Sequence, residues 1–320
     1  MAEKRVGLLS QLFPPKPTWT AADVPDQTGK IIIVTGGNGG IGRETARVLL
    51  SKGAKVYIAT RSEEKSQKAI EELKKETGKD SIFFLKLDLA DLVSVKAAAE
   101  EYTSKETELH TLYNNGGVMY TPIDHVTTQG FDMQFGTNVL GHFYLTKLLL
   151  PVLTATAKKT PAGTVRVVNV SSLGHQYGPP EGIRWATLAP GNDSLEARKK
   201  LNTTKLYGQS KLGNILFSNE LARRYGAEGI VSTSLHPGAI NTDLARHTSS
   251  LLQRFGRIVT YDVSHGAITS LYAGTAPDAG ELNGKYITAW ARVVVPNKKA
   301  LDAELGKKLW EWCEEQVKDI

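Results

Sequence analysis

Cysteine is almost absent from this chain of 320 residues, which contains only Cys313. A single cysteine excludes an intrachain disulfide, and its rarity favours a reducing compartment such as the cytoplasm. The seven histidines are scattered singly, without the close Cys/His spacing of a zinc site, so we expect no metal centre. A chain of this length can bury enough surface to fold without disulfides or a structural metal.

Long apolar runs are also lacking, and no uninterrupted stretch approaches the ~20 residues that would cross a bilayer. The first residues combine Lys4 and Arg5 with a broken apolar pattern and lack the small-residue cleavage site of a signal peptide. We expect a short amphipathic N-terminal arm over residues 1–28. Such an arm leaves peripheral contact with a membrane surface open.

The excess of positive charge is small. The chain has 39 Lys and Arg against 33 Asp and Glu, a formal net charge of +6. No Lys/Arg-rich run with interleaved aromatic residues accompanies it, so we expect no nucleic-acid partner. A mildly basic protein that binds a polyanionic cofactor explains the charge equally well.

Short β-branched runs alternate with helical patterns along most of the chain. Strands are predicted at residues 31–35, 55–59, 82–87, 109–113, 164–170 and 231–235, and helices at 41–52, 63–77, 92–103, 131–150 and 205–225. This alternation predicts an α/β fold of the Rossmann type, a doubly wound parallel sheet with helices on both faces. Ligands of such sheets bind at the carboxyl ends of the strands.

Three segments do not follow this alternation. They are the arm, residues 178–204 and the tail beyond Gly238. We expect a single domain over residues 29–320, with 178–204 and 239–258 as insertions that form a substrate lid, because long connections without obvious elements are usually functional.

Glycine is concentrated in the run TGGNGGIG of residues 35–42, between the first predicted strand and helix. Glycine permits a positive φ and a close approach of the backbone to a pyrophosphate, which the helix N-terminus stabilises. The run alone is also consistent with an ordinary tight turn, but its place in a βαβ unit predicts nucleotide binding. Read as G-x-G-x-x-G, the run matches at Gly37, Gly39 and Gly42; read as T-G-x-x-x-G-x-G, it matches at Gly36, Gly40 and Gly42. We expect the cofactor contact from Gly36, Asn38, Gly40, Ile41 and Gly42.

An acidic residue is missing from the end of the second predicted strand, where it would bind the adenosine ribose. Ala59, Thr60 and Arg61 occupy this position. Arg61 offers a planar, permanently charged group suited to phosphate, and Arg43 could reach the same phosphate. Arg61 could also simply begin a charged surface helix. The missing acid favours NADP(H) over NAD(H).

Tyr207 and Lys211 lie four residues apart in a predicted helix and therefore project from one face. Free tyrosine, with a pKa of ~10, is too weak an acid for proton transfer near neutral pH. A lysine cation beside it would favour the phenolate and lower its pKa. Ser172 ends a predicted strand at the ligand-binding rim, where its hydroxyl could stabilise charge on a substrate oxygen. Each residue alone is also consistent with an ordinary surface or turn position.

Taken together and in this order, the motifs resemble those of the short-chain dehydrogenase/reductase family. The match runs from about residue 31 to residue 242 and comprises the glycine run, Asp88, Asn114–Gly117, Asn138, Ser172, Tyr207 with Lys211, and Pro237-Gly238. The resemblance implies an NADP(H)-dependent enzyme that transfers a hydride between nicotinamide and a carbonyl or alcohol.

The resemblance also implies individual roles. Tyr207 would be the general acid in reduction and the base in oxidation, and Lys211 would hold the nicotinamide ribose and lower the pKa of Tyr207. Ser172 would orient the substrate, and Asn138 would support a water-linked proton relay. The cofactor pocket would also include Asp88, Leu89, Asn115, Gly116, Gly117, Pro237, Gly238 and Thr242.

Two features depart from the usual family pattern. Gly116 replaces a frequent alanine, and the separation of 35 residues between Ser172 and Tyr207 (207 − 172) is unusually long. The long separation resembles the retinol dehydrogenase-like and WW-domain oxidoreductase-like branch, which acts on lipophilic alcohols and aldehydes. We expect a lipophilic or aromatic small-molecule substrate, and a monomer or homodimer because the insertion could block a helix-packed interface.

An NADP-binding redox sensor or scaffold without turnover is the alternative function. The same fold serves both classes of protein, so the fold does not decide between them. The intact Ser172, Tyr207 and Lys211 argue for the enzyme.

Overall fold

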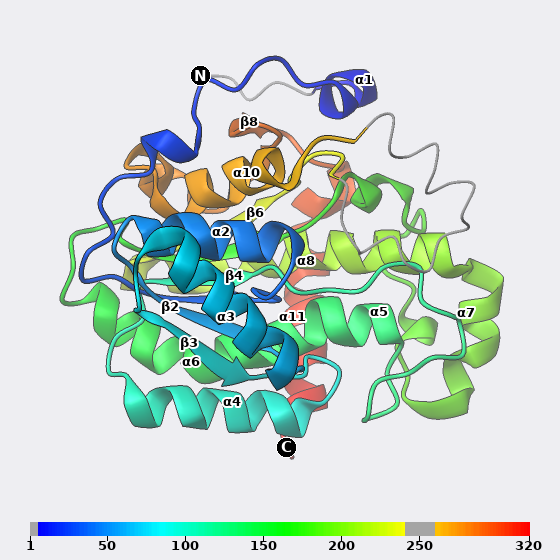
Figure 1. The fold of residues 1–320 in the computed structure, drawn as a ribbon. Coiled ribbons are helices and arrows are strands. Elements are labelled where there is room, and N and C mark those ends of the chain that lie inside the picture. Colours follow the sequence, from blue (N-terminus) through cyan, green and yellow to red (C-terminus); the bar gives the residue numbers. More distant parts are fainter. Residues whose placement is uncertain (1–5, 241–259) are drawn as a thin grey trace.

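The computed structural model describes residues 6–240 and 260–320 and contains one mixed sheet (Figure 1). Its strands are β1 (Ile31–Thr35), β2 (Lys55–Thr60), β3 (Ile82–Lys86), β4 (Thr111–Asn114), β5 (Val165–Val170), β6 (Ile230–Leu235), β7 (Tyr286–Thr288) and β8 (Arg292–Val294). They lie in the order β3-β2-β1-β4-β5-β6-β7-β8, and every neighbouring pair is parallel except β7 with β8. The predicted Rossmann-type sheet is confirmed, with an antiparallel strand added at one edge.

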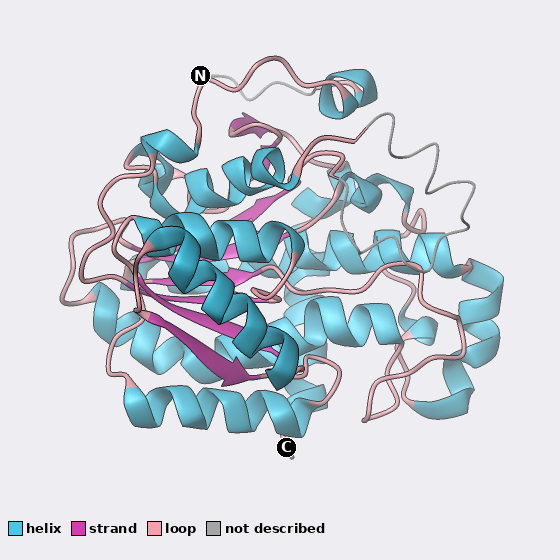
Figure 2. Cartoon of the chain, in the orientation of Figure 1, coloured by secondary structure: helices cyan, strands magenta, loops and turns pink. Residues whose placement is uncertain are grey.

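Helices cover both faces of the sheet, as Figure 2 shows. They are α1 (Leu8–Leu12), α2 (Gly40–Ser51), α3 (Glu63–Thr77), α4 (Leu92–Lys105), α5 (Met133–Phe135), α6 (Gly141–Ala157), α7 (Leu195–Leu201), α8 (Thr203–Tyr225), α10 (Val263–Thr275) and α11 (Ala303–Val317). Alternate residues of β1 separate two cores: Ile33 belongs to the core of α4, α6, α8 and α11, whereas Ile32 and Val34 belong to the core of α2, α3 and α10. The carboxyl ends of the parallel strands therefore meet at one rim between two helical layers.

Most predicted boundaries agree with the structure to within two residues, but the helix predicted at 131–150 does not. There, α5 leads into a π-helical turn (Gly136–Leu140) before α6 continues to Ala157. Residues 133–157 are long and apolar enough to cross a membrane, yet 72% of their most apolar window is buried within the protein. They form a core helix, and its distorted turn contains Asn138.

Two regions for which the sequence predicts no elements contain helices and strands. Residues 178–204 hold α7 and two 3-10 turns. The tail beyond Gly238 contributes α10, β7, β8 and α11, and the two strands have only three residues each, too few for a hydrophobic pattern to predict. Residues 241–259 lie outside the described residues, and with them most of the predicted lid segment 239–258.

The N-terminal arm is docked on the β7–β8 edge of the sheet. Arg292 donates hydrogen bonds to the hydroxyl and carbonyl of Ser10, at 3.0 and 2.7 Å. The side chain of Gln11 is buried and accepts a hydrogen bond from Thr288 at 3.4 Å. Leu9 and Phe13 remain exposed, and contact of the arm with a membrane stays a prediction.

Gly274 lets α10 pack directly on the sheet. A β-carbon there would lie 1.8 Å from Oη of the buried Tyr113. We predict that Gly274→Ala lowers the free energy of unfolding by about 2–3 kcal/mol, the cost of overpacking a core. Gly306→Ala is the matched control, because the nearest atom to its β-carbon would be 3.6 Å away. Replacing a helical glycine there should raise the free energy of unfolding by up to ~1 kcal/mol. Urea unfolding measures both, and equal effects would contradict this account of the packing.

Candidate active site

The glycine run forms a tight loop between β1 and α2 that leaves no room for a β-carbon at several of its glycines. Gly36 has a φ of +66°, and a β-carbon on it would lie 3.0 Å from the Cα of Gly116. A β-carbon on Gly42 would lie 2.4 Å from the carbonyl oxygen of Gly36 and 2.5 Å from Nδ2 of Asn115. Glycine is required at both positions because the second segment of chain comes so close.

Thr35, the last residue of β1, joins this loop to the end of β4. Its hydroxyl accepts hydrogen bonds from the backbone N–H groups of Asn115 and Gly116, at 2.9 and 2.8 Å. Its carbonyl accepts a third from the side-chain amide of Asn115 at 2.8 Å. The structure thus brings the two predicted cofactor-binding segments together at the carboxyl edge of the sheet.

The N-terminus of α2 points out of this loop. Its N-cap is Gly39, which has no side chain to accept hydrogen bonds from the first-turn amides. Those N–H groups, with the positive end of the helix dipole, can hold a phosphate. Asn38 is half-buried in the loop, and Ile41 extends to Gly266 of α10, so Ile41 also fixes the helix against the second layer.

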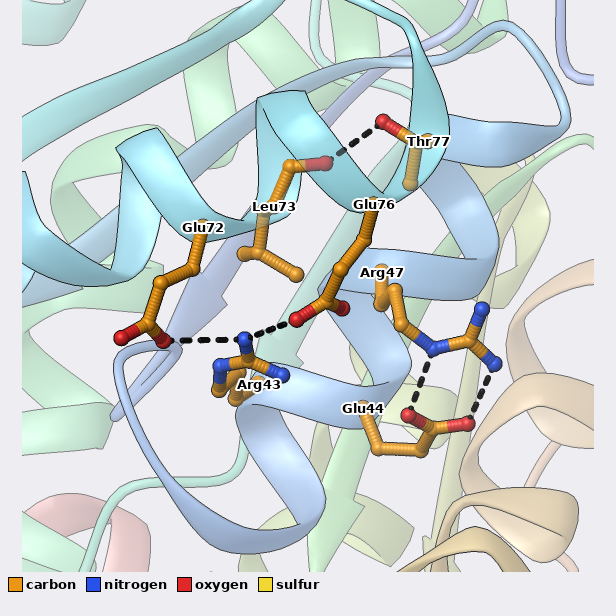
Figure 3. Close-up of polar contacts among 7 residues, drawn as sticks. All are labelled: Arg43, Glu44, Arg47, Glu72, Leu73, Glu76 and Thr77. Atoms are coloured by element: carbon orange, nitrogen blue, oxygen red, sulfur yellow. Dashed lines mark hydrogen bonds and ion pairs between the residues drawn. The ribbon is translucent and has the colours of Figure 1, made fainter.

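The two arginines predicted to bind a phosphate have different environments. Arg61 follows β2, is exposed, and makes no hydrogen bond or ion pair with any residue in the described part of the chain. Arg43 instead lies against α3, where one Nη2 atom contacts Glu72 at 3.1 Å and Glu76 at 2.6 Å (Figure 3). Glu72 lies nine residues beyond Glu63, which corresponds to roughly 14 Å along a helix that rises ~1.5 Å per residue.

Arg43 is therefore held two to three turns along α3 from the strand end that carries Arg61. To reach a phosphate beside Arg61, its guanidinium would have to leave both carboxylates. This pairing could not be predicted from the sequence, because Glu72 and Glu76 are equally consistent with an ordinary charged surface helix.

Asp88 and Leu89 follow β3 on the same rim. The carboxylate of Asp88 accepts a hydrogen bond from the backbone N–H of Ala90, and its own N–H donates to the hydroxyl of Ser94, both at 2.9 Å. Leu89 comes close to the segment after β4, because a β-carbon on Gly116 would lie 3.0 Å from its Cδ1. Leu89 thus lies against the segment that crosses the loop, and Asp88 immediately precedes it on the same rim.

Tyr207, Lys211 and Ser172 converge at the end of β5. Tyr207 and Lys211 are buried on one face of α8, with the Lys211 ammonium 5.8 Å from the centre of the Tyr207 ring. Lys211 donates a hydrogen bond to the carbonyl of Val170 at 3.0 Å. Ser172, two residues later, bonds through its hydroxyl to the Tyr207 side chain. The predicted catalytic trio is thus assembled around one point.

The pKa of Tyr207 differs from the sequence-based expectation. Burial raises the pKa of its phenol, and the hydrogen bond from Ser172 only partly offsets that rise. Burial also lowers the pKa of Lys211 to about 8. Burial thus outweighs the Ser172 hydrogen bond at Tyr207, while the Lys211 ammonium donates its hydrogen bond to the Val170 carbonyl.

Asn138 lies in the π-helical turn and is fully buried. Its side chain spans two elements: it exchanges hydrogen bonds with the backbone of Val118 at 2.9 and 3.0 Å and donates one to Ser210 of α8 at 3.0 Å. A β-carbon on Gly117 would lie 2.8 Å from Oδ1 of Asn138 and 3.7 Å from Nζ of Lys211. Asn138 and Gly117 therefore border the catalytic trio.

Sequence reasoning missed the three residues between Tyr207 and Lys211. A β-carbon on Gly208 would lie 2.7 Å from the backbone nitrogen of Gly178, so the insertion packs directly on α8. Gln209 is buried and binds the insertion through the backbone N–H of Arg184 at 2.7 Å and the hydroxyl of Thr187 at 2.9 Å. In the sequence, the only indication of these roles is that Gly208 and Gln209 lie between Tyr207 and Lys211 in one helical turn.

Sequence reasoning also missed Tyr120. Its ring lies edge-on to that of Tyr207, with 5.4 Å between the centroids. Its backbone has a φ of 54° and its N–H donates to Gln134 at 2.8 Å. Tyr120 thus forms an aromatic wall beside the reactive phenol.

The remaining predicted contacts lie after β6. Pro237 and Gly238 are buried, and Gly238 has a φ of +99° against the ring of Trp290. Thr242 lies outside the described residues. Within residues 6–240 and 260–320, no group of three or more His, Cys, Asp or Glu could hold a metal ion.

Known proteins match this arrangement. The family model for short chain dehydrogenases matches residues 30–187. A short-chain dehydrogenase/reductase of Armillaria gallica is 54% identical over 98% of both chains. An uncharacterised oxidoreductase of Schizosaccharomyces pombe is 41% identical over 95% of this chain and 89% of its own.

Solved structures agree on the fold. An uncharacterised protein of Mycobacterium paratuberculosis superposes with a TM-score of 0.69 at 31% identity, over 94% of this chain and 97% of its own. The complex of RhlG from Pseudomonas aeruginosa with NADP gives a TM-score of 0.62 at 23% identity, over 81% of this chain and 94% of its own.

These comparisons show the family but no branch within it, so the finer resemblance to retinol dehydrogenases stays a prediction. The extent of the match, together with the loop and the assembled trio, establishes the family itself. The chain belongs to the short-chain dehydrogenase/reductase family and is an NAD(P)-dependent oxidoreductase.

Proposed function

We propose that this protein transfers a hydride between NADP(H) and a carbonyl or alcohol, with Tyr207 as the proton donor and acceptor. The observation that carries the proposal is the convergence of Ser172, Tyr207 and Lys211 on the rim that holds the glycine loop. A sheet edge with a phosphate cradle and a proton-transfer group side by side suits a redox reaction on a bound small molecule.

In the reduction of a carbonyl, each of the three residues would have a separate role. NADPH would supply the hydride to the carbonyl carbon. Tyr207 would give its phenolic proton to the carbonyl oxygen, and Ser172 would donate a hydrogen bond that stabilises the developing charge. Lys211 would hold the ribose and return a proton toward Tyr207. Oxidation of an alcohol would reverse each step.

A preference for NADP(H) is supported by Arg61 at the end of β2, whose guanidinium has no ion-pair partner among residues 6–240 and 260–320. A guanidinium without a carboxylate partner can bind a 2′-phosphate through two parallel hydrogen bonds. Arg43 is a poorer candidate, because two carboxylates already face its single positive charge. The RhlG structure, which shares this fold, contains NADP.

We predict that Arg61→Ala raises the Kd for NADPH at least tenfold and leaves the Kd for NADH within twofold. The lost interaction is a charge-assisted hydrogen bond, worth about 1.5–3 kcal/mol. Arg43→Ala is the matched control and should change the Kd for NADPH less than threefold. Quenching of tryptophan fluorescence measures all these values. A larger loss in Arg43→Ala than in Arg61→Ala would show that Arg43 exchanges its carboxylates for the phosphate.

A lipophilic or aromatic substrate is supported by the surroundings of Tyr207. The ring of Tyr120 stands against it, and the insertion that begins at Gly178 packs on the next residue of α8. The alternative, an NADP-binding redox sensor without turnover, requires the same cofactor cradle but no functional trio.

The first experiment follows the absorbance of NADPH, and separately NADH, with a panel of aryl, alkyl and isoprenoid aldehydes and ketones. We predict that NADPH is consumed faster and that Tyr207→Phe loses at least the ~10²–10⁴-fold typical of general acid–base catalysis. The Kd for NADPH should stay unchanged, because the phenol hydroxyl serves the proton transfer.

Tyr120→Phe is the matched control, since it keeps an aromatic ring 5.4 Å from Tyr207 and removes only a hydroxyl. Its turnover should stay close to that of the unmodified protein. Turnover that survives in Tyr207→Phe would refute the mechanism. Binding of both cofactors without consumption of either, across the whole panel, would favour the sensor.

A further inference from the structure

His142 lies one helical turn beyond Asn138 and is buried beneath the active site. One ring nitrogen, Nε2, is 2.9 Å from the hydroxyl oxygen of Thr35, and the other, Nδ1, is 3.0 Å from the backbone carbonyl oxygen of Asn138. The ring therefore connects the strand that starts the cofactor loop with the π-helical turn beside Lys211.

The protons of this connection can be assigned by counting donors and acceptors. The Thr35 hydroxyl already accepts from the N–H groups of Asn115 and Gly116, which occupy both of its lone pairs. Its one proton must go to the carbonyl of Tyr113 at 3.2 Å or to Nε2 of His142 at 2.9 Å. A protonated Nε2 would be a third donor to a saturated oxygen.

The Asn138 side of the ring leads to the same assignment. A carbonyl oxygen only accepts, so Nδ1 must carry a proton to make a bond at 3.0 Å. Burial, and the nearby charge of Lys211, lower the pKa of His142 to about 4, so the ring is neutral and carries one proton. That proton sits on Nδ1, and Nε2 accepts from Thr35.

We propose that His142 is a positioning residue: as a neutral ring protonated on Nδ1, it fixes the backbone carbonyl of Asn138 for the proton transfer by Tyr207 and Lys211, and ties it to the cofactor strand through Thr35. Asn138 needs such a support because its own side chain is fully engaged with Val118 and Ser210. The π-helical turn interrupts the regular helix at this point.

This inference rests on the proposed function, but its first test does not need turnover. Nitrogen-15 NMR of the histidine-labelled protein distinguishes the two neutral forms of a ring, and the spectrum of His142→Gln identifies which signals belong to His142. We expect protonation on Nδ1 at pH 7, with and without NADPH. Protonation on Nε2, or a charged ring, would overturn the assignment.

The second test uses two amides that each replace one half of the ring. In His142→Asn the side-chain nitrogen occupies the place of Nδ1 and can still donate to Asn138. In His142→Gln the amide occupies the place of Nε2 and reaches only Thr35. We expect kcat within threefold of the unmodified protein for the first variant and at least tenfold lower for the second, with the Kd for NADPH unchanged in both.

Thr146→Val is the control for a merely structural role. Thr146 is buried one turn further along α6 and accepts a hydrogen bond from Asn114 at 3.0 Å, so its loss should lower the melting temperature and leave kcat unchanged. Equal kcat values for the two amide variants would refute the positioning role. A loss of kcat that follows the melting temperature across all three variants would refute it as well. If no carbonyl is turned over but His142 is protonated on Nδ1, the proposed function is refuted while the hydrogen-bond assignment stands.

Discussion

Thr35 is the residue on which the geometry of the active site depends. Through one hydroxyl and one carbonyl it holds the segment after β4 by three hydrogen bonds, and it also contacts His142. Because this segment then crosses the glycine loop at van der Waals distance, the loop must lack β-carbons at Gly36 and Gly42. The conspicuous glycines are thus a consequence of how tightly two strand ends are joined, and the phosphate cradle follows from the same contact.

The parts of the site that could be predicted from the sequence are those fixed by local geometry. The positions of Tyr207 and Lys211 follow from helical spacing, and Ser172 lies on the rim because its strand ends there. The parts that could not be predicted depend on how elements cross. Arg43 is held by α3 because α2 and α3 pack side by side (Figure 3), and the π-helical turn around Asn138 has no signature in its sequence beyond the poor helix propensity of asparagine.

Burial affects the two proton-transfer groups in opposite ways. It raises the pKa of Tyr207 and lowers that of Lys211, since in each case it disfavours the charged form. Burial therefore favours the neutral forms of both side chains more than exposure to water would. A positive charge brought close to the phenol would stabilise the phenolate, and an oxidised nicotinamide ring carries such a charge. The proposed mechanism therefore predicts that Tyr207 stays protonated until the cofactor and substrate bind.

The residues between Tyr207 and Lys211 connect the proposed proton-transfer site to the insertion of residues 178–204. Gly208 lets the insertion approach the backbone of α8, Gln209 binds it through Arg184 and Thr187, and Ser210 binds Asn138. One helical turn therefore carries the reactive phenol, the attachment of the insertion and the support of the proton-relay turn. A change in the insertion that shifts Gln209 should also shift Tyr207, because only Gly208 separates the two in α8. The proposed function therefore predicts that substrate selection and proton transfer are coupled, so that an exchange of the insertion alone changes kcat together with KM.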